Sequence, residues 1–187
     1  MIEKYSYGQN KCPSEKANVI ERFKKSRAEE IRADLQENRS EAVMICHNLD
    51  YNINIGSVIR ANNAFLGKEV YVVGRRKIDR RSSVGCMHYE NVYHADTFGE
   101  VFECLHEQGY IILAVDNIEV YSPVDISEYS FPKKTAFVLG NEGDGLPEEV
   151  IKQTDDMVFI QQKGSVRSLC VAQAAAVALY EYGRNYA

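Results

Sequence analysis

A glycine-rich stretch from Thr135 to Glu149 has the residue types that bind ligands through the backbone: Thr-Ala-Phe-Val-Leu-Gly-Asn-Glu-Gly-Asp-Gly-Leu-Pro-Glu-Glu. Glycines at 140, 143 and 145 follow a short apolar run, and Pro147 with two glutamates is typical of the first turn of a helix. The spacing matches neither the dinucleotide-binding fingerprint nor the P-loop. Acidic side chains, which would repel a pyrophosphate, stand at Glu142, Asp144, Glu148 and Glu149. We therefore expect a ligand that is neutral or cationic where it touches this loop; the alternative is a turn that only reverses the chain.

A second polar group lies on one stripe of a predicted helix from about Ile55 to Phe65. Gly56, Arg60 and Asn63 recur at i, i+4 and i+7, apart from the apolar stripe of the same helix. An arginine in this place, behind a glycine and two asparagines, suits an anionic or hydroxyl-bearing ligand. An ordinary exposed surface arginine is the alternative.

A strongly basic run, Arg75-Arg-Lys-Ile-Asp-Arg-Arg81, carries five cations and one acid directly after a predicted strand. Such a run is typical of a solvated loop, and the same charge pattern binds the phosphate backbone of nucleic acids. The net charge of the whole chain, −5, argues only weakly against a nucleic-acid partner, because clustered cations act locally.

Five cysteines are scattered along the chain, at 12, 46, 86, 104 and 170, with no C-x-x-C pair. Their odd number and spacing indicate reduced thiols in a cytoplasmic protein, and argue against a zinc site or a disulfide framework. His88 and His94 flank tyrosines without the spacing of metal ligands, so we interpret them as structural and expect no metal. No apolar run reaches the roughly 18 residues of a membrane span, and the N-terminus lacks the pattern of a signal peptide.

Strands that alternate with helices from residue 42 onward must position these groups. The predicted strands are 42–46, 69–73, 110–115, 136–139 and 157–160. The predicted helices are 55–65, 97–108, a short one from Pro147, and 169–182 with Ser168 as its N-cap. Strands that are apolar throughout indicate an α/β fold with a mostly parallel sheet, covered by helices on both faces. Ligands of such sheets bind at the carboxyl ends of the strands, where the polar groups fall.

The first forty residues are predicted to form a charged, helical N-terminal extension without a strand. A chain of 187 residues with 45% hydrophobic content suffices for one full core. Because residues 1–40 precede the first predicted buried strand and contain no strand of their own, we interpret them as an appendage to a single domain, 41–187. The extension is either a solvated surface or an accessory segment that binds RNA or another partner.

Three ordered motifs carry a resemblance to a known family. They are Asn54-x-Gly-Ser-x-x-Arg60, Leu139-Gly-Asn-Glu-Gly-x-Gly-Leu146, and Ile160-x-x-x-Gly164-x-x-x-Ser-Leu169 before an alanine-rich helix. Each is weak alone, but all three in this order, each at a strand end, resemble the SpoU/TrmH-like RNA 2′-O-ribose methyltransferases of the SPOUT superfamily. The resemblance covers roughly residues 40 to 182.

The resemblance implies S-adenosylmethionine as the cofactor, tRNA or rRNA as the substrate, a homodimer, and a C-terminal trefoil knot, one of the rare exceptions to unthreaded chains. It also accounts for the glycine-rich stretch. In this family the cofactor is held bent by backbone groups of the knot loops, and its cationic sulfonium tolerates nearby acids.

The same motifs assign roles to residues of this chain. The implied catalytic residues are Asn54, Arg60, Glu142 and Ser168. The implied cofactor-binding residues are Leu139, Gly140, Asn141, Gly143, Ile160, Gly164, Ser168 and Leu169. The expected RNA-binding residues are Arg60, Asn63, Arg75, Arg76, Lys77, Arg80 and Arg81. Because a guanidinium holds its proton up to a pKa above about 12, we expect Arg60 to stabilise charge and position the ribose rather than act as a general base.

The chain departs from the family pattern at Cys170, where asparagine is usual after Ser-Leu, and at Gln161-Gln162, where Pro-Met is usual. One alternative is therefore a non-catalytic RNA-binding homologue with a decayed site. Another is a small-molecule-binding α/β protein, which would leave the basic run without a role.

Overall fold

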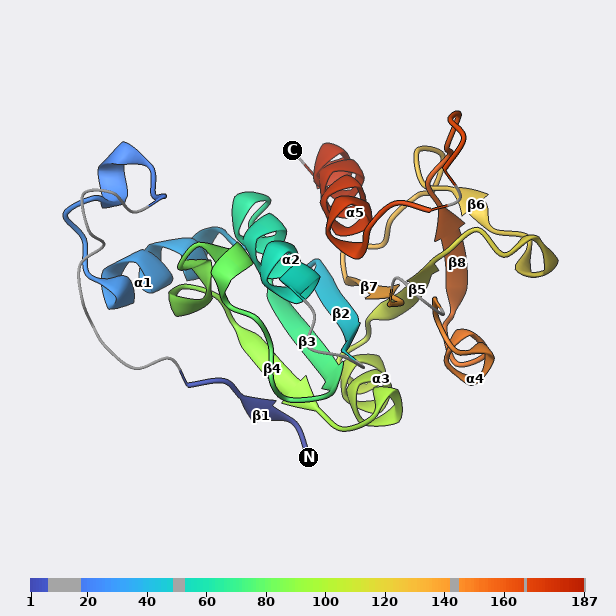
Figure 1. The fold of residues 1–187 in the computed structure, drawn as a ribbon, viewed down its shortest axis with the longest axis horizontal. Helices are drawn as coiled ribbons and strands as arrows, with labels where there is room; N and C mark the ends of the chain where they lie inside the picture. The colour runs from blue at the N-terminus through green and yellow to red at the C-terminus, as the bar shows by residue number, and fades with distance from the viewer. Residues whose placement is uncertain (7–17, 49–52, 142–144, 167, 187) are drawn as a thin grey trace.

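The computed structural model describes residues 1–6, 18–48, 53–141, 145–166 and 168–186 of the chain (Figure 1). Its strands are β1 (Glu3–Lys4), β2 (Val43–Asn48), β3 (Glu69–Gly74), β4 (Val92–Ala95), β5 (Ile111–Val115), β6 (Val124–Asp125), β7 (Thr135–Leu139) and β8 (Asp156–Phe159). Its α-helices are α1 (Ala28–Asn38), α2 (Ile53–Ala64), α3 (Phe98–Glu107), α4 (Glu148–Ile151) and α5 (Val171–Tyr186). Four short 3₁₀ helices are η1 (Glu21–Phe23), η2 (Arg81–Ser83), η3 (Cys86–His88) and η4 (Glu119–Tyr121).

The described strands form one sheet of eight, in the order β1-β4-β3-β2-β7-β5-β8-β6. Every neighbouring pair is parallel except β1 with β4, so the predicted mostly parallel sheet is confirmed. Two strands that come late in the chain lie inside this order, because β7 separates β2 from β5 and β8 separates β5 from β6.

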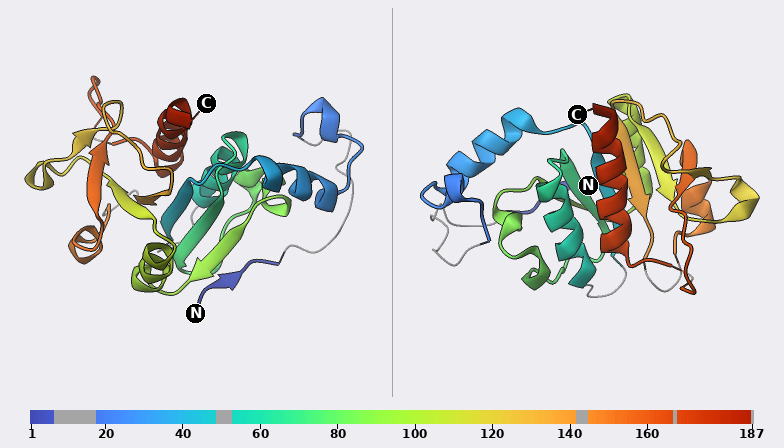
Figure 2. Two further views of the ribbon diagram at one scale, coloured as in Figure 1. Left: turned by 180° about the vertical axis from the view of Figure 1, so that it is seen from behind. Right: turned by 90° about the horizontal axis from the view of Figure 1, so that it is seen from above.

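Helices cover both faces of the sheet, as predicted, because alternate residues of each strand point to opposite faces. In β2, Met44 and Cys46 pack in a core layer with α2 and α5, whereas Val43 and Ile45 pack in a second layer with α3 and α4. Figures 1 and 2 show α2 and α5 side by side on the same face. No helix in the described part of the chain combines the length and the apolar character needed to cross a membrane.

The expectation that the N-terminal extension contains no strand is wrong. Residues Glu3 and Lys4 form β1, which pairs antiparallel with Tyr93 and His94 of β4 and extends the sheet at that edge. Backbone hydrogen bonds such as Tyr5 N–H to the Val92 carbonyl, at 3.0 Å, hold this strand rather than an apolar face. Its two charged, exposed side chains therefore gave no sign of a strand in the sequence.

The rest of the extension is in part helical, with η1 and α1 packed on the domain. Phe23, Ile31 and Leu35 of the extension form a small hydrophobic cluster with Tyr89 of the domain, separate from the two main core layers. We call this group the satellite cluster.

Several predicted boundaries move. The first strand runs on to Asn48, because His47 and Asn48 still pair with Val73 and Gly74 of β3. Strands β4 and β6 were not predicted, since Val92-Tyr-His-Ala95 is too mixed in polarity to read as a buried run and β6 has only two residues. The final helix begins at Val171, two residues later than expected.

Candidate functional site

The segments that carry the three sequence motifs follow strands that end on the same side of the sheet. Because β2, β3, β5, β7 and β8 are mutually parallel, the segments that follow them leave from the same side. Chain order reverses where β7 lies between β2 and β5, which is the kind of crevice where open α/β sheets bind ligands. The structure therefore places the three sequence motifs at the carboxyl ends of these parallel strands.

The glycine loop after β7 folds tightly onto itself. Asn141 and Gly145 exchange backbone hydrogen bonds of 3.3 and 3.1 Å, and Gly145 has a φ of +69°, which favours glycine. A Cβ on Gly140 would overlap the backbone of Gly145 and lie 2.6 Å from the Leu146 nitrogen. Leu139 is buried in the core just before this turn. The predicted residues Glu142 and Gly143 lie outside the described residues.

A cavity of about 90 Å³ near this loop collects residues that follow two strands, β5 and β8, and one residue of α5. It is lined by Ile160, Ser168 and Leu169, all predicted cofactor-binding residues. It adjoins a wider, more open cavity of about 660 Å³, and the two share Ile160 and Gln162. Gly164 is different: within the described structure, a Cβ on it would meet open space.

Three residues of this region were missed in the sequence, namely Asp116, Asn117 and Gln162. Asp116 and Asn117 directly follow β5, and a carboxylate oxygen of Asp116 lies 3.3 Å from where a Cβ on Gly145 would be. In the sequence, Asp116 and Asn117 could have been found as two polar residues directly after a predicted strand, where ligands of such sheets bind. The buried side-chain oxygen of Gln162 has no hydrogen-bond partner among the described residues. It is therefore able to accept a hydrogen bond from a ligand.

Helix α2 presents Arg60 at the surface beside the basic loop, residues 75–83. Gly56 allows the contact, because a Cβ there would lie 2.7 Å from the Asp79 carbonyl oxygen and 3.0 Å from the Ser83 nitrogen. The Ser82 hydroxyl also donates to the carbonyl of Ile53 in the first turn of α2. Arg60 itself is exposed and makes no hydrogen bond or ion pair with other described residues. Asn54 is half-buried in the first turn of the same helix.

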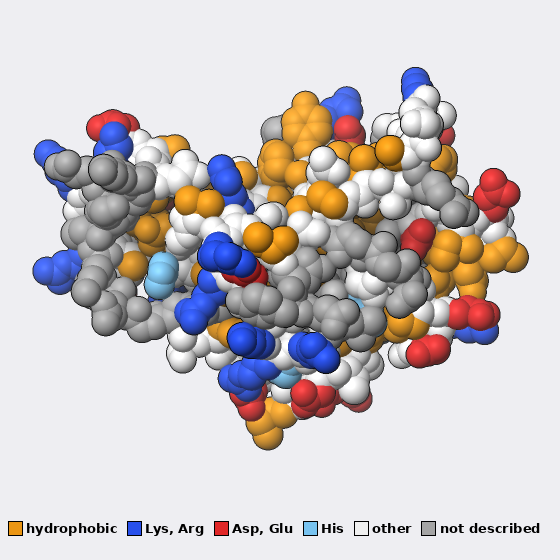
Figure 3. Space-filling view, viewed as in Figure 1, with side chains coloured by type: hydrophobic (Ala, Val, Ile, Leu, Met, Phe, Trp, Pro, Cys, Tyr) orange, Lys and Arg blue, Asp and Glu red, His pale blue; other side chains and the backbone are white. Residues whose placement is uncertain are grey.

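Buried polar side chains hold the basic loop in place. The amide nitrogen of fully buried Asn48 donates to the carbonyls of Arg75 and Lys77, at 2.6 and 3.1 Å. Buried Asp79 accepts hydrogen bonds from Arg81, which hold the pKa of Asp79 below its usual range. Exposed cations of the loop are Arg75, Arg76, Lys77, Arg80 and Arg81. Figure 3 shows Lys and Arg side chains gathered over the region where β3, β4 and α2 lie in Figure 1.

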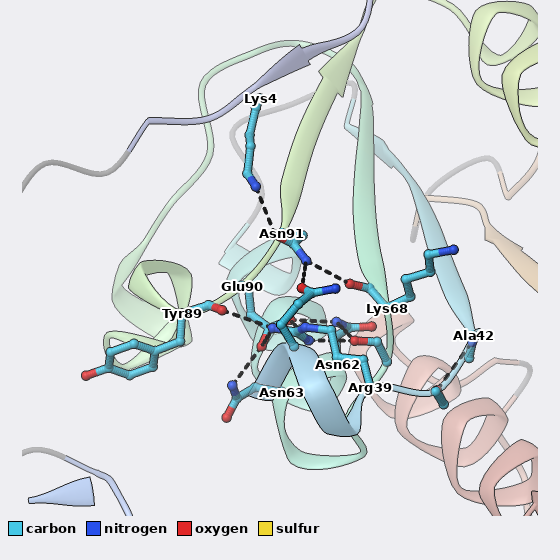
Figure 4. A network of polar contacts seen from close by, with 12 residues as sticks. Lys4, Arg39, Ala42, Asn62, Asn63, Lys68, Tyr89, Glu90 and Asn91 are labelled. Atoms are coloured by element: carbon cyan, nitrogen blue, oxygen red, sulfur yellow. Dashed lines mark hydrogen bonds and ion pairs between the residues drawn. The ribbon is translucent and has the colours of Figure 1, made fainter. Parts of the chain in front are cut away.

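The far end of α2 is fixed by a buried ion pair (Figure 4). Arg39, which follows α1, contacts both carboxylate oxygens of Glu90, at 2.9 and 3.1 Å, and their side chains are 2% and 0% exposed. Asn62 and Asn63 each donate to the same carboxylate at 2.7 Å. Asn63 was predicted to bind RNA; the structure places its amide nitrogen on Glu90, one turn of helix beyond Arg60.

The expectation that Ser168 caps the last helix is wrong. The carbonyl of Cys170 accepts from the backbone N–H groups of Gln173 and Ala174, at 2.9 and 3.1 Å, which is the pattern of an N-cap residue. The Gln173 side chain in turn accepts from the Cys170 N–H at 3.3 Å, half of a capping box. Cys170 therefore occupies the cap, and Ser168 is exposed at the cavity instead.

His94, one of the two histidines expected to be structural, has such a contact in the structure. His94 is buried, with its Nε2 2.7 Å from the Gly74 carbonyl oxygen, and so helps to fix the turn after β3. Among the described residues, no group of three or more His, Cys, Asp or Glu side chains is arranged to hold a metal ion.

Comparison with known proteins agrees with this architecture. The fold is similar to the solved structure of the A. aeolicus TrmH/SpoU tRNA modifying enzyme, with a TM-score of 0.74 at 22% identity over 84% of this chain and 81% of that chain. The SpoU methyltransferase AviRb from Streptomyces viridochromogenes, in complex with AdoMet, gives 0.69 at 26% identity, over 82% and 61% of the two chains.

Sequence comparison identifies the family. The model of the SpoU rRNA Methylase family matches residues 41–180, so the chain belongs to this family. The chain is similar to the tRNA (guanosine(18)-2′-O)-methyltransferase of Escherichia coli (strain K12), at 29% identity over 71% of this chain and 58% of that protein. It is also 29% identical to the mouse enzyme of the same activity, TARBP1, over 82% of this chain but only 10% of that protein. The chain thus spans less than two thirds of these relatives.

Proposed function

We propose that this protein transfers a methyl group from S-adenosylmethionine to a ribose 2′-hydroxyl of tRNA or rRNA. The observation that carries the proposal is that the three family motifs follow the carboxyl ends of parallel strands of one sheet, β2, β7 and β8, where Ile160, Ser168 and Leu169 of the third motif line a cavity. The names of the relatives, which include tRNA 2′-O-methyltransferases and an AdoMet-bound SpoU enzyme, support it.

The residues of the cavity fit this cofactor. Gly140 has no room for a Cβ because the backbone of Gly145 packs against it, so the loop after β7 is tight and made of backbone, as the family's cofactor loop requires. The unpaired oxygen of Gln162 can accept from an amino group, and the carboxylate of Asp116 suits a cationic ligand. Ile160 and Leu169 supply apolar wall. When bound, S-adenosylmethionine supplies the electrophilic methyl group.

Arg60 carries the proposed catalytic role on the RNA side. Its exposed guanidinium can hold the phosphate next to the target ribose and stabilise negative charge that develops on the 2′-oxygen. The exposed cations of the adjoining basic loop are suited to phosphates further along the strand. Phosphate contacts of this kind position the RNA without reading its sequence.

The proposal includes a homodimer, a C-terminal trefoil knot and a reducing, cytoplasmic setting. The insertion of β7 and β8 between earlier strands supports the knot, and the free thiols of Cys46, Cys86, Cys104 and Cys170 support the setting. We infer that residues 1–40 are an accessory extension of a catalytic unit, 41–187; the start of the family match at residue 41 supports this division. The alternative of a decayed site rested on Cys170, which instead serves as a helix cap.

Cofactor binding is tested by thermal unfolding. A ligand at about 100 times its dissociation constant stabilises by roughly 2.7 kcal/mol, and each kcal/mol raises the midpoint by about 2–4 °C at this size. S-adenosylmethionine should therefore raise the midpoint by roughly 5–10 °C, whereas ATP and NAD should not. Absence of a shift at millimolar concentration would contradict the proposal.

Arg60→Ala then separates chemistry from cofactor binding. Because Arg60 is exposed and makes no hydrogen bond or ion pair with other described residues, the variant should keep the wild-type midpoint and the cofactor-induced shift. Methyl transfer to RNA should fall by about 10² or more, the usual scale for a lost charge-stabilising group. Transfer at the wild-type rate would remove Arg60 from the site.

A further inference from the structure

A partly enclosed cavity of about 270 Å³ lies between the N-terminal extension and the domain, built on the satellite cluster. Protein interiors leave few voids larger than a water molecule, so this volume is large for a packing defect. It is just below the roughly 300–1,000 Å³ of pockets for drug-sized ligands. A smaller, flat ligand would therefore fit.

The wall of this cavity combines flat rings with amide groups. Phe23 and Tyr89 provide aromatic surface, and the Arg22 guanidinium lies over the Phe23 ring, 4.3 Å from its centroid. Asn18 and Asn63 contribute side-chain amides. Unstacked RNA bases are held by this set of groups: aromatic rings, guanidinium planes, and hydrogen-bonding groups at the base edges.

Asn63 is oriented for such a contact. Its amide nitrogen donates to Glu90 at 2.7 Å, and Figure 4 shows its oxygen turned away from that carboxylate. The buried pair of Glu90 with Arg39 keeps this orientation fixed. The amide oxygen is thus left to accept from the amino group of a base.

The cavity lies within one helical turn of Arg60. Asn63 and Ala64, which line it, follow Arg60 by three and four residues on α2. Cys86 forms another part of the wall; burial raises the pKa of its thiol to about 11, and the nearby charge of Arg60 opposes that shift. Arg60 and the wall of the cavity are thus close enough along α2 to contact neighbouring nucleotides of one RNA strand.

We propose that this cavity binds a splayed-out base of the RNA, within one nucleotide of the ribose that Arg60 contacts. The inference rests on the proposed function and adds a base-reading site that the extension helps to build. The mostly apolar wall suits neither a metal ion nor a free anion. Exposed Arg60 supplies the positive charge for a neighbouring phosphate, whereas Arg22 pairs with Asp34 at 2.8 Å and offers its guanidinium plane over Phe23.

The test compares two fluorescein-labelled octamers, oligoadenylate and an abasic ribose–phosphate strand of equal length. Phe23→Leu keeps an apolar side chain in the satellite cluster but removes the ring, whereas the matched control Tyr89→Phe keeps the ring. A stacking contact typically changes affinity by about 5- to 150-fold. Phe23→Leu should therefore weaken binding of oligoadenylate at least fivefold and leave the abasic strand unaffected, and Tyr89→Phe should change neither.

A second variant distinguishes the loss of base binding from a local folding defect in Phe23→Leu. Ala64 is exposed at the last position of α2, so Ala64→Trp should fill the cavity and preserve the thermal midpoint. It should lower affinity for oligoadenylate but not for the abasic strand. Wild-type affinity for oligoadenylate in both Phe23→Leu and Ala64→Trp would overturn the proposal, as would an equal loss for the two octamers.

Methyl transfer and the cofactor-induced thermal shift, measured on the same proteins, separate this inference from the proposed function. If the wild type transfers methyl groups and Phe23→Leu keeps the wild-type KM for RNA, only the base-binding cavity is wrong. If the wild type binds neither octamer and shows no cofactor shift, both proposals fail.

Discussion

Two groups of strands contribute their carboxyl ends to the candidate site, and the surroundings of these two halves are built in different ways. Around β2, β3 and α2, surface cations are held by buried polar anchors, of which Asn48, Asp79 and Glu90 each bond two or more groups. Around β7, β5 and β8, the shape of the loop after β7 depends on glycines without side chains, because Gly140 packs directly against the backbone of Gly145. The half that we propose to bind RNA should therefore fail when one buried side chain is lost, and the half that we propose to bind the cofactor should fail when one side chain is added.

The largest effect should come from breaking the buried ion pair. Arg39→Ala leaves the Glu90 carboxylate buried without its cation, which typically costs about 3–5 kcal/mol. The thermal midpoint should fall by roughly 6–20 °C at this chain length. The control is Arg22→Ala, which breaks an exposed pair with Asp34 and should cost less than about 1 kcal/mol. Similar losses in the two variants would contradict the anchoring role.

Two motif glycines test the other half. Gly140→Ala forces a Cβ against backbone that cannot move aside, so about 1–3 kcal/mol of stability should be lost. Because the loop after β7 must open to make room for the new methyl group, affinity for S-adenosylmethionine should fall more than tenfold in calorimetric titration. The matched variant Gly164→Ala enters open space and should change stability by less than about 0.5 kcal/mol. Equal effects of the two would refute the close-approach argument.

Asn48→Leu should have an intermediate effect that is confined to the RNA side. It keeps the volume but leaves the carbonyls of Arg75 and Lys77 without their donor, at a cost of roughly 1–2 kcal/mol. Because the basic loop loses its anchor, RNA affinity should drop while the cofactor-induced thermal shift persists. Asn185→Ala, which removes an exposed bond to the Glu181 carbonyl, is the control and should be close to neutral. A loss of cofactor binding in Asn48→Leu would show that the two halves are not separable.

The smallest effect, and a favourable one, is expected at Cys170. Asparagine is a better N-cap than cysteine because its side-chain oxygen can accept from the first free N–H groups of α5, a gain of about 0.5–1 kcal/mol. Cys170→Asn should thus raise the midpoint by roughly 1–4 °C, with cofactor affinity within a few-fold of wild type. Cys170→Ala, which lacks the acceptor, should not be stabilised. A destabilised Cys170→Asn would show that the thiol has a packing role of its own.

The sequence predicted what depends on long apolar runs and on motif spacing. β2, β3, β5, β7 and β8 were found because they are apolar throughout. Ile160, Ser168 and Leu169, which line the cavity, were marked by the family pattern, and their role in cofactor binding stays a prediction. β1 was missed because its two residues are charged and exposed, and its backbone pairing with β4 leaves no apolar pattern in the sequence. Asp116 and Gln162 were missed because they reach the cavity through the strand order, which no local pattern encodes. The cap at Cys170 was missed because cysteine is not a typical cap residue.

The short strand β1 also covers one edge of the sheet against the addition of a strand from another chain. An uncovered edge strand presents a row of unpaired N–H and C=O groups on which another chain can add. In this molecule β1 occupies that row on β4, and the charged side chains of Glu3 and Lys4 face solvent. Lys4 is held by Asn91 at 2.9 Å, and the Tyr5 hydroxyl by the Arg76 carbonyl at 2.6 Å. Deletion of residues 1–5, or an affinity tag that displaces them, would therefore open β4 to strand addition and promote aggregation.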